Sequence, residues 1–150
     1  MPPRGKNGRM GRLAATLLAI PLLAAAAPTA AVEVDLSGLR NHRGTVHACL
    51  TRNPKYFPDC KKDPLALKQT IQADGGHVEF RDVPPGRYAL SVFHDENSNH
   101  KLDTFLGIPR EGFGFSRNPV IRVGPPRFDK VSIELTPGLA RASIRMQYLL

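Results

Sequence analysis

The stretch from Asp95 to Asp103 (DENSNHKLD) concentrates oxygen-bearing side chains at alternating positions. Positions 1, 3, 5 and 9 of this stretch are Asp95, Asn97, Asn99 and Asp103. Ca²⁺ takes about six to eight oxygen ligands, and alternate positions of a tight loop can turn several of them inward. The spacing therefore predicts a weak calcium site, to which Glu96 and Glu111 could contribute further oxygens.

The same residue types also have a purely structural interpretation. Asp and Asn side chains accept hydrogen bonds from nearby backbone N–H groups and so build turns without any ion. His100 occupies the position where a helix–loop–helix calcium site has glycine, and Leu106 stands where that site has a bidentate glutamate. Both interpretations remain open for this loop.

The sequence has two cysteines, Cys49 and Cys60, which is the smallest number that can form a disulfide bond. In an oxidising compartment they are expected to form a disulfide, which would stabilise the fold by about 3 kcal/mol. A metal-binding pair and two free thiols are the alternatives.

Residues 1–31 have the three parts of a secretory signal peptide. Four basic residues precede a continuous apolar run, Leu13–Ala27, and small residues follow it. The run is shorter than the roughly 20 residues that span a bilayer as a helix. We expect cleavage after Ala31, a single domain over residues 32–150 with no transmembrane segment, and a periplasmic or secreted location.

The charge of the chain excludes one class of partner. The full sequence has a net charge of +8, but residues 1–31 contain four of its 21 basic residues and none of its 13 acidic ones. The remaining net charge of +4 is ordinary for a soluble domain. With no basic stripe and no recognised motif, nucleic-acid binding is not expected.

Alternation of apolar and polar residues dominates the part after residue 31 and predicts β-strands. Turn residues interrupt it, most clearly at Pro84-Pro85-Gly86. Strands are predicted over residues 32–36, 45–50, 65–73, 78–83, 87–95, 131–135 and 144–148. About seven short strands and no strong helix favour an all-β fold: an antiparallel two-sheet sandwich, immunoglobulin-like or transthyretin-like.

Four ordered motifs resemble a family of small exported bacterial proteins that is known only as a conserved domain of unknown function. They have the patterns PPGxYA, DENxNxKLD, GIPxEGxGFS and GPPxF, and they begin at Pro84, Asp95, Gly107 and Gly124. His100 departs from the pattern, because a glycine is common there. The resemblance supports the fold and the exported location, and it implies no activity.

The third motif, residues 107–116 (GIPREGFGFS), is a candidate binding loop. Its glycines permit unusual backbone paths, and its aromatic rings can insert into the core. A cover over one end of the sandwich is the alternative. The residues that could form a ligand or partner surface are Arg110, Glu111, Phe113, Phe115 and Ser116.

Catalytic signatures are lacking in the sequence. None of its five histidines has the spacing of a HExxH zinc site, and there is no Gly-x-Ser-x-Gly motif. The leading hypothesis is a non-catalytic binding or accessory module for a cell-envelope protein or glycan, with Ca²⁺ as a possible rigidifying ion. A small hydrolase of transthyretin-like fold and an assembly protein that pairs through a sheet edge are the alternatives.

Overall fold

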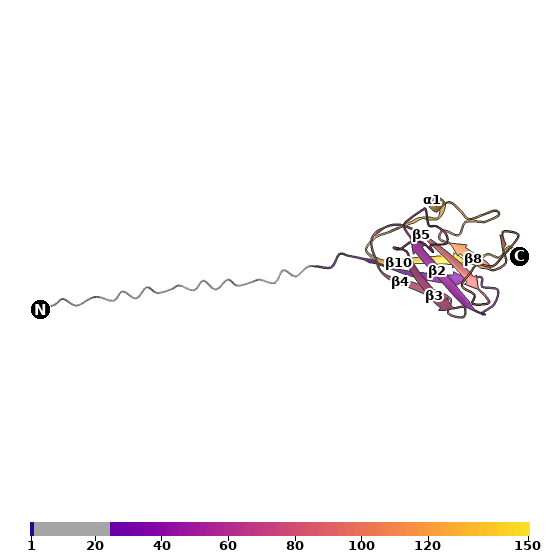
Figure 1. Ribbon diagram of the computed structural model, residues 1–150, viewed down its shortest axis with the longest axis horizontal. Helices are drawn as coiled ribbons and strands as arrows, with labels where there is room; N and C mark the ends of the chain where they lie inside the picture. The colour runs from indigo at the N-terminus through magenta and orange to yellow at the C-terminus, as the bar shows by residue number, and fades with distance from the viewer. Residues whose placement is uncertain (2–24) are drawn as a thin grey trace.

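The computed structural model describes Met1 and residues 25–150. Most of the predicted signal peptide therefore lies outside the described residues. Within the described part, no helix is long and apolar enough to cross a lipid bilayer. Residues 25–30 enter the domain at one end, and Leu150 lies at the opposite end (Figure 1).

The smaller of two stacked sheets has three strands in the order β10-β1-β4. Their bounds are Gly138–Arg145, Ala30–Ser37 and His77–Val83. β1 pairs with β4 in antiparallel fashion but with β10 in parallel, Val34 lying opposite Ala142. The expectation of a purely antiparallel sandwich is therefore wrong at this one pair, because strand alternation in a sequence does not specify the partner or its direction.

The larger sheet has the order β3-β2-β5-β8, and β9 pairs with the other half of β5. The bounds of these strands are Leu67–Gln72, Thr45–Thr51, Gly86–Asp95, Gly112–Phe115 and Ile133–Leu135. A separate short hairpin consists of β6 (Thr104–Phe105) and β7 (Ile108–Pro109). The one helix of the described residues, α1 (Phe128–Val131), lies at the periphery of the domain (Figure 1).

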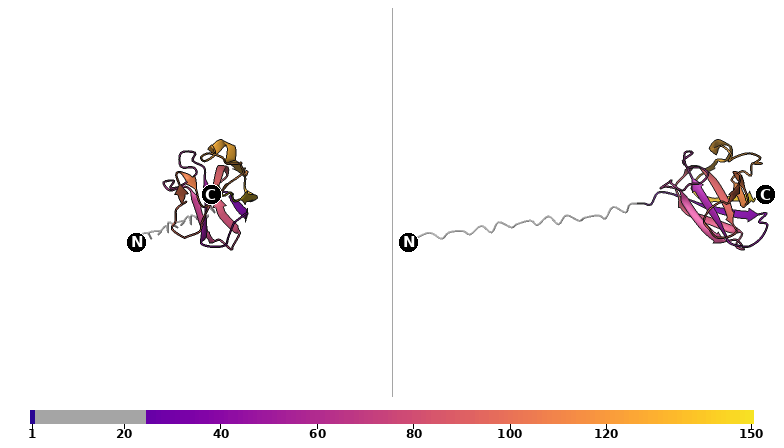
Figure 2. Two further views of the ribbon diagram at one scale, coloured as in Figure 1. Left: turned by 90° about the vertical axis from the view of Figure 1, so that its right-hand side faces the viewer. Right: turned by 45° about the vertical axis from the view of Figure 1, so that its right-hand side comes forward.

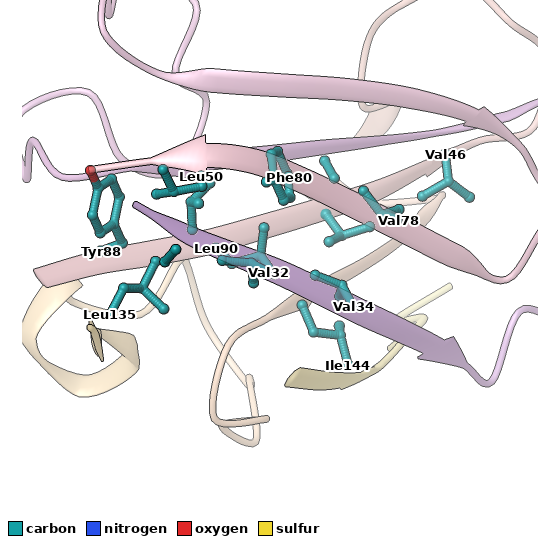
Figure 3. Packing of buried hydrophobic residues seen from close by; sticks show 14 of the residues in the cluster. Val32, Val34, Val46, Leu50, Val78, Phe80, Tyr88, Leu90, Leu135 and Ile144 are labelled. Atoms are coloured by element: carbon teal, nitrogen blue, oxygen red, sulfur yellow. The ribbon is translucent and has the colours of Figure 1, made fainter. Parts of the chain in front are cut away.

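The core lies between the two sheets, which overlap in each view of the domain (Figure 2). The inward residues alternate along the strands, as in Val32 and Val34 of β1 and Val46, Ala48 and Leu50 of β2. Figure 3 shows Val32 and Leu50 close to Phe80 of β4 and Leu90 of β5, and Val46 close to Val78 of β4. The all-β sandwich is confirmed, and seven of its strands have four or more residues.

Three expected elements differ from the observed ones. The last strand, expected over residues 144–148, is β10, which begins at Gly138 and ends at Arg145. Its first residues are mostly exposed because β10 is an edge strand, so they lack the apolar alternation that predicts a strand. Val131, expected to open a strand, ends α1 instead, and β9 begins only at Ile133. The segment 107–116, treated as a loop, contains β8, whose four residues are all buried. The sequence of β8 does not predict a strand, because every second residue is glycine and glycine is uncommon in strands.

Close packing explains why β8 uses glycine. A Cβ on Gly114 would lie 2.4 Å from the Ile144 side chain, and one on Gly112 would lie 2.5 Å from the Tyr148 ring. Glycine therefore lets β8 approach the C-terminal segment, where Phe113 and Gln147 form a backbone bridge. This contact links the two sheets along one side of the sandwich.

Candidate functional site

A pocket of about 300 Å³ lies on the face of the larger sheet that points away from the core. Its floor is built from two rows of residues that lie directly opposite one another across four strands. The first row is Thr70, His47, Phe93 and Phe113, and the second is Lys68, Cys49, Ser91 and Phe115. Because alternate residues of a strand share a face, both rows point to the same side of the sheet.

The disulfide Cys49–Cys60, which confirms the predicted pairing, holds one wall of the pocket in place. Cys49 belongs to the floor, and Cys60 lies in the loop that follows β2, so the bond attaches this loop to the outer face. Pro58 and Asp59 of the same loop line the pocket. A hydrogen bond of 2.7 Å from Ser91 Oγ to the carbonyl of Pro58 provides a second attachment.

A second hydrophobic cluster lies beside the pocket on the outer face. Its buried members are Ala89, Phe113, Phe115, Phe128 and Val131, with Phe57 and Phe93 packed against them. Helix α1 and the loop after β2 therefore cover part of the outer face beside the pocket. The two phenylalanines of β8 take part in both the cluster and the pocket.

The rim of the pocket is mainly basic. Lys61 and Lys101 line it, Lys68 ends the second row of the floor beside it, and all three are exposed. Asp59 is the one exposed carboxylate among the lining residues. The three phenylalanines of the floor and these lysines together can hold a small molecule that has an apolar body and an acidic group.

At one end of the pocket, His47, Asp95 and His100 each place a ligand atom within 4.8 Å of the others. His47 Nε2 lies 3.2 Å from Asp95 Oδ2. The two imidazole rings meet edge to face, with centroids 5.4 Å apart. Three separate parts of the chain converge here: the middle of β2, the end of β5 and the loop after it.

Asp95 is fully buried and held by backbone hydrogen bonds. Its Oδ1 accepts the N–H of Asn99 at 3.0 Å, and its Oδ2 accepts the N–H of His100 at 2.7 Å. Burial alone would raise the pKa of Asp95, but these two bonds and the contact with His47 outweigh it and lower the pKa. The carboxylate is therefore an anion at neutral pH.

His47 is held from both sides. Its ring stacks on Phe93 with centroids 4.7 Å apart, and its Nδ1 lies 2.9 Å from Thr70 Oγ1. Its Nε2 also lies 3.1 Å from Thr45 Oγ1. These contacts fix the orientation of the ring and aim Nε2 at Asp95.

The polar side chains of the predicted calcium loop bond to one another. Asn97 and Asn99 donate their amide N–H groups to the Asp103 carboxylate at 2.7 and 2.9 Å. The carbonyl oxygens of the same two amides accept backbone N–H groups of Asn99 and Lys101. The structure thus brings all four residues of the loop together in turn hydrogen bonds, and calcium binding stays a prediction.

Glu111 and Glu96, expected as additional ligands, stabilise the loop from outside. Glu111 is buried and accepts the N–H groups of Glu96 and Asp103, each at 2.9 Å. Glu96 accepts hydrogen bonds from Arg40 and Asn41 at 2.8 and 2.7 Å. Burial would raise the pKa of Glu96, but these bonds lower it overall.

The turn before β2 also fixes the loop. Gly44 has a φ of 70°, and a Cβ at this position would lie 1.9 Å from the carbonyl oxygen of Asp95. Only glycine permits so close an approach with this backbone conformation. His94, the neighbour of Asp95, is buried and uses both ring nitrogens, toward Tyr148 Oη and the carbonyl of Arg43. His94 is thus a structural residue.

Only some residues of the candidate binding loop, 107–116, line the pocket. Phe113 and Phe115 line the pocket, whereas Ser116 is buried and bonds to the backbone of Leu90 and Val131. Arg110 is exposed and does not line the pocket. Sequence reasoning missed His47 and Thr70, although the alternation of residues 45–50 already placed His47 opposite the core.

Comparison of the sequence with models of protein families identifies the family of the chain. The model of the family described as "Uncharacterized protein conserved in bacteria (DUF2141)" matches residues 34–142. The chain belongs to this family. No curated protein and no solved structure matches the chain. The matched range of DUF2141 includes the pocket floor, its disulfide wall and the His47–Asp95–His100 cluster.

Proposed function

We propose that this DUF2141 protein is an extracytoplasmic, non-catalytic binding module that holds a small organic anion in the pocket on the larger sheet. The observation that carries the proposal is the combination of three phenylalanines on the pocket floor with three exposed lysines among the lining residues. The disulfide supports an oxidising compartment, where such bonds persist. The proposal replaces the sequence-based expectation of an envelope protein or glycan as the partner with a small molecule.

The apolar part of the ligand would contact Phe93, Phe113 and Phe115. Phe113 and Phe115 are 95 % buried, so a ligand would extend an existing aromatic cluster. The acidic group would lie at the rim near Lys61 or Lys68. A volume of about 300 Å³ suits a ligand of one or two fused rings.

The test uses 1-naphthoate as probe and 1-naphthalenemethanol as its neutral counterpart, with binding measured by calorimetry and by NMR shifts of the pocket residues. The acid should bind more tightly, and Lys61→Glu or Lys68→Glu should weaken it by about tenfold, or ~1.4 kcal/mol. Lys62→Glu is the matched control, since Lys62 is exposed but does not line the pocket. Equal binding of acid and alcohol, or equal effects of Lys61→Glu and Lys62→Glu, would refute the proposal.

One specific observation favours a second candidate, a hydrolase. Thr70 Oγ1, His47 and Asp95 form a hydroxyl–imidazole–carboxylate series with distances of 2.9 and 3.2 Å. Such a series can activate a hydroxyl as a nucleophile. Hydrolysis of p-nitrophenyl acetate decides between the two candidates. A saturable activity that Thr70→Ala abolishes would favour the hydrolase. Hydrolysis at the uncatalysed background rate by both the unmodified chain and Thr70→Ala would favour the binding module.

A further inference from the structure

We infer that His47, Asp95 and His100 form a binding site for a divalent transition-metal ion, Zn²⁺ or an ion of similar preference, at the end of the pocket. Two imidazoles and one carboxylate are the ligand set of many zinc sites with an open fourth position. The inference rests on these three side chains and does not depend on the organic anion proposed above.

Two of the ligands already have the required spacing. With bonds of about 2.1 Å, two ligands of one tetrahedral ion lie about 3.4 Å apart. His47 Nε2 and Asp95 Oδ2 are 3.2 Å apart. Only the third ligand must approach, because the three atoms span up to 4.8 Å.

That third ligand, His100, is placed where it can move. Its side chain is exposed, and it lies in the loop after β5 with a φ of 62°. Its backbone N–H stays bonded to Asp95 Oδ2, so the side chain can rotate toward the ion while the backbone remains attached.

The surroundings match those of metal ligands. A histidine that binds a metal usually uses its other ring nitrogen in a hydrogen bond that fixes the ring, as His47 Nδ1 does with Thr70. Asp95 is likewise oriented by two backbone N–H groups. The fourth position opens into the pocket, which His47 and His100 both line.

The ligand chemistry separates this site from the predicted calcium loop. Ca²⁺ prefers oxygen ligands, whereas imidazole suits Zn²⁺, Cu²⁺ and Ni²⁺. Asp95 is common to both hypotheses, but His47 and His100 belong only to the transition-metal site. An ion series therefore distinguishes the two.

The test titrates the full chain, disulfide intact and stripped with chelator, with Co²⁺ and then with Zn²⁺ in competition. We expect one saturable site with the visible absorption of low-symmetry Co²⁺. His47→Ala and His100→Ala should each weaken binding by about 100-fold or more, and Thr70→Val by about tenfold. Ca²⁺ at the same concentration should not displace Co²⁺.

The matched control is His77→Ala. His77 pairs with Asp35 at 3.1 Å on the other sheet, so it forms a histidine–carboxylate pair that has no third ligand within the part of the chain that the structure describes. This variant should bind like the unmodified chain. The inference is overturned if no saturable site appears, or if His100→Ala, with an unchanged melting temperature in chelator, binds as tightly as the unmodified chain. The naphthoate experiment without metal tests the proposed function separately.

Discussion

Buried carboxylates organise the loop after β5 at the level of single residues. Asp95 bonds to backbone N–H groups within the loop, and Glu111 bonds to both its beginning and its end. An anionic acceptor makes each of these bonds stronger than a neutral one would. The two carboxylates therefore set the position of His100 relative to His47.

Removing the Glu111 carboxylate should loosen this loop. Glu111→Ala leaves the N–H groups of Glu96 and Asp103 without their acceptor, and we expect a loss of about 2 kcal/mol or more in the free energy of unfolding. Urea denaturation measures it. Glu134→Ala, at an exposed glutamate of β9, is the control and should change stability little. Similar losses in both variants would contradict the assigned role.

At the scale of elements, the disulfide joins strand β2 to the loop that follows it. A double variant, Cys49→Ala with Cys60→Ala, should lower the free energy of unfolding by about 3 kcal/mol. It should also weaken naphthoate binding, because the wall formed by Pro58 and Asp59 loses its attachment. Metal binding at His47 and His100 should persist in the folded variant. Unchanged naphthoate affinity would show that this loop is not part of the site.

The packing of β8 against the C-terminal segment gives a second prediction for an element. Gly114→Ala places a methyl group against the fully buried Ile144, and we expect a loss of about 1–3 kcal/mol in the free energy of unfolding. Thermal and urea unfolding measure it. A change within about 0.5 kcal/mol would mean that β8 shifts without cost.

Strand positions were more predictable than strand partners. The alternation at Val46, Ala48 and Leu50 specified which face of β2 is buried, and Pro84-Pro85-Gly86 located the corner between β4 and β5. The parallel pairing of β1 with β10 could not be predicted, since it depends on the path of the whole chain. Only the cross-strand register brings His47 opposite Phe93, and so next to Asp95.

At the scale of the molecule, acid stability follows from three carboxylates. Asp63, Asp95 and Glu96 all have a pKa lowered in the folded state. For Asp63 the main cause is the hydrogen bond from the Thr51 hydroxyl. A lowered folded pKa adds stability above the ordinary values of 3.8 for Asp and 4.5 for Glu, and this stability is lost as the pH falls through the folded values.

The melting temperature should therefore vary little between about pH 7 and pH 5 and fall below about pH 4. Asp63→Asn should show a smaller acid-induced fall, because it has no proton to gain at this position. Scanning calorimetry at several pH values measures both. A melting temperature that rises as the pH falls below 4 would contradict the assigned directions.

The predicted signal-peptide cleavage would change the smaller sheet. Cleavage after Ala31 would remove Ala30 and Ala31 from β1, and with them the pairing to Gly138, Leu139 and Val83. The mature strand would then begin at Val32, which is fully buried and lies opposite Ala140. Mass spectrometry of the protein isolated from cells that express the full sequence tests this prediction, since it locates the actual N-terminus.

The most direct test of the binding site is a crystal structure of the chain soaked with Zn²⁺ and 1-naphthoate, with diffraction recorded on both sides of the zinc absorption edge. We predict one strong anomalous peak within bonding distance of His47, Asp95 and His100, and naphthoate density over Phe93. An anomalous peak only at other residues, together with an unoccupied pocket, would contradict the assignment of this face as the binding surface.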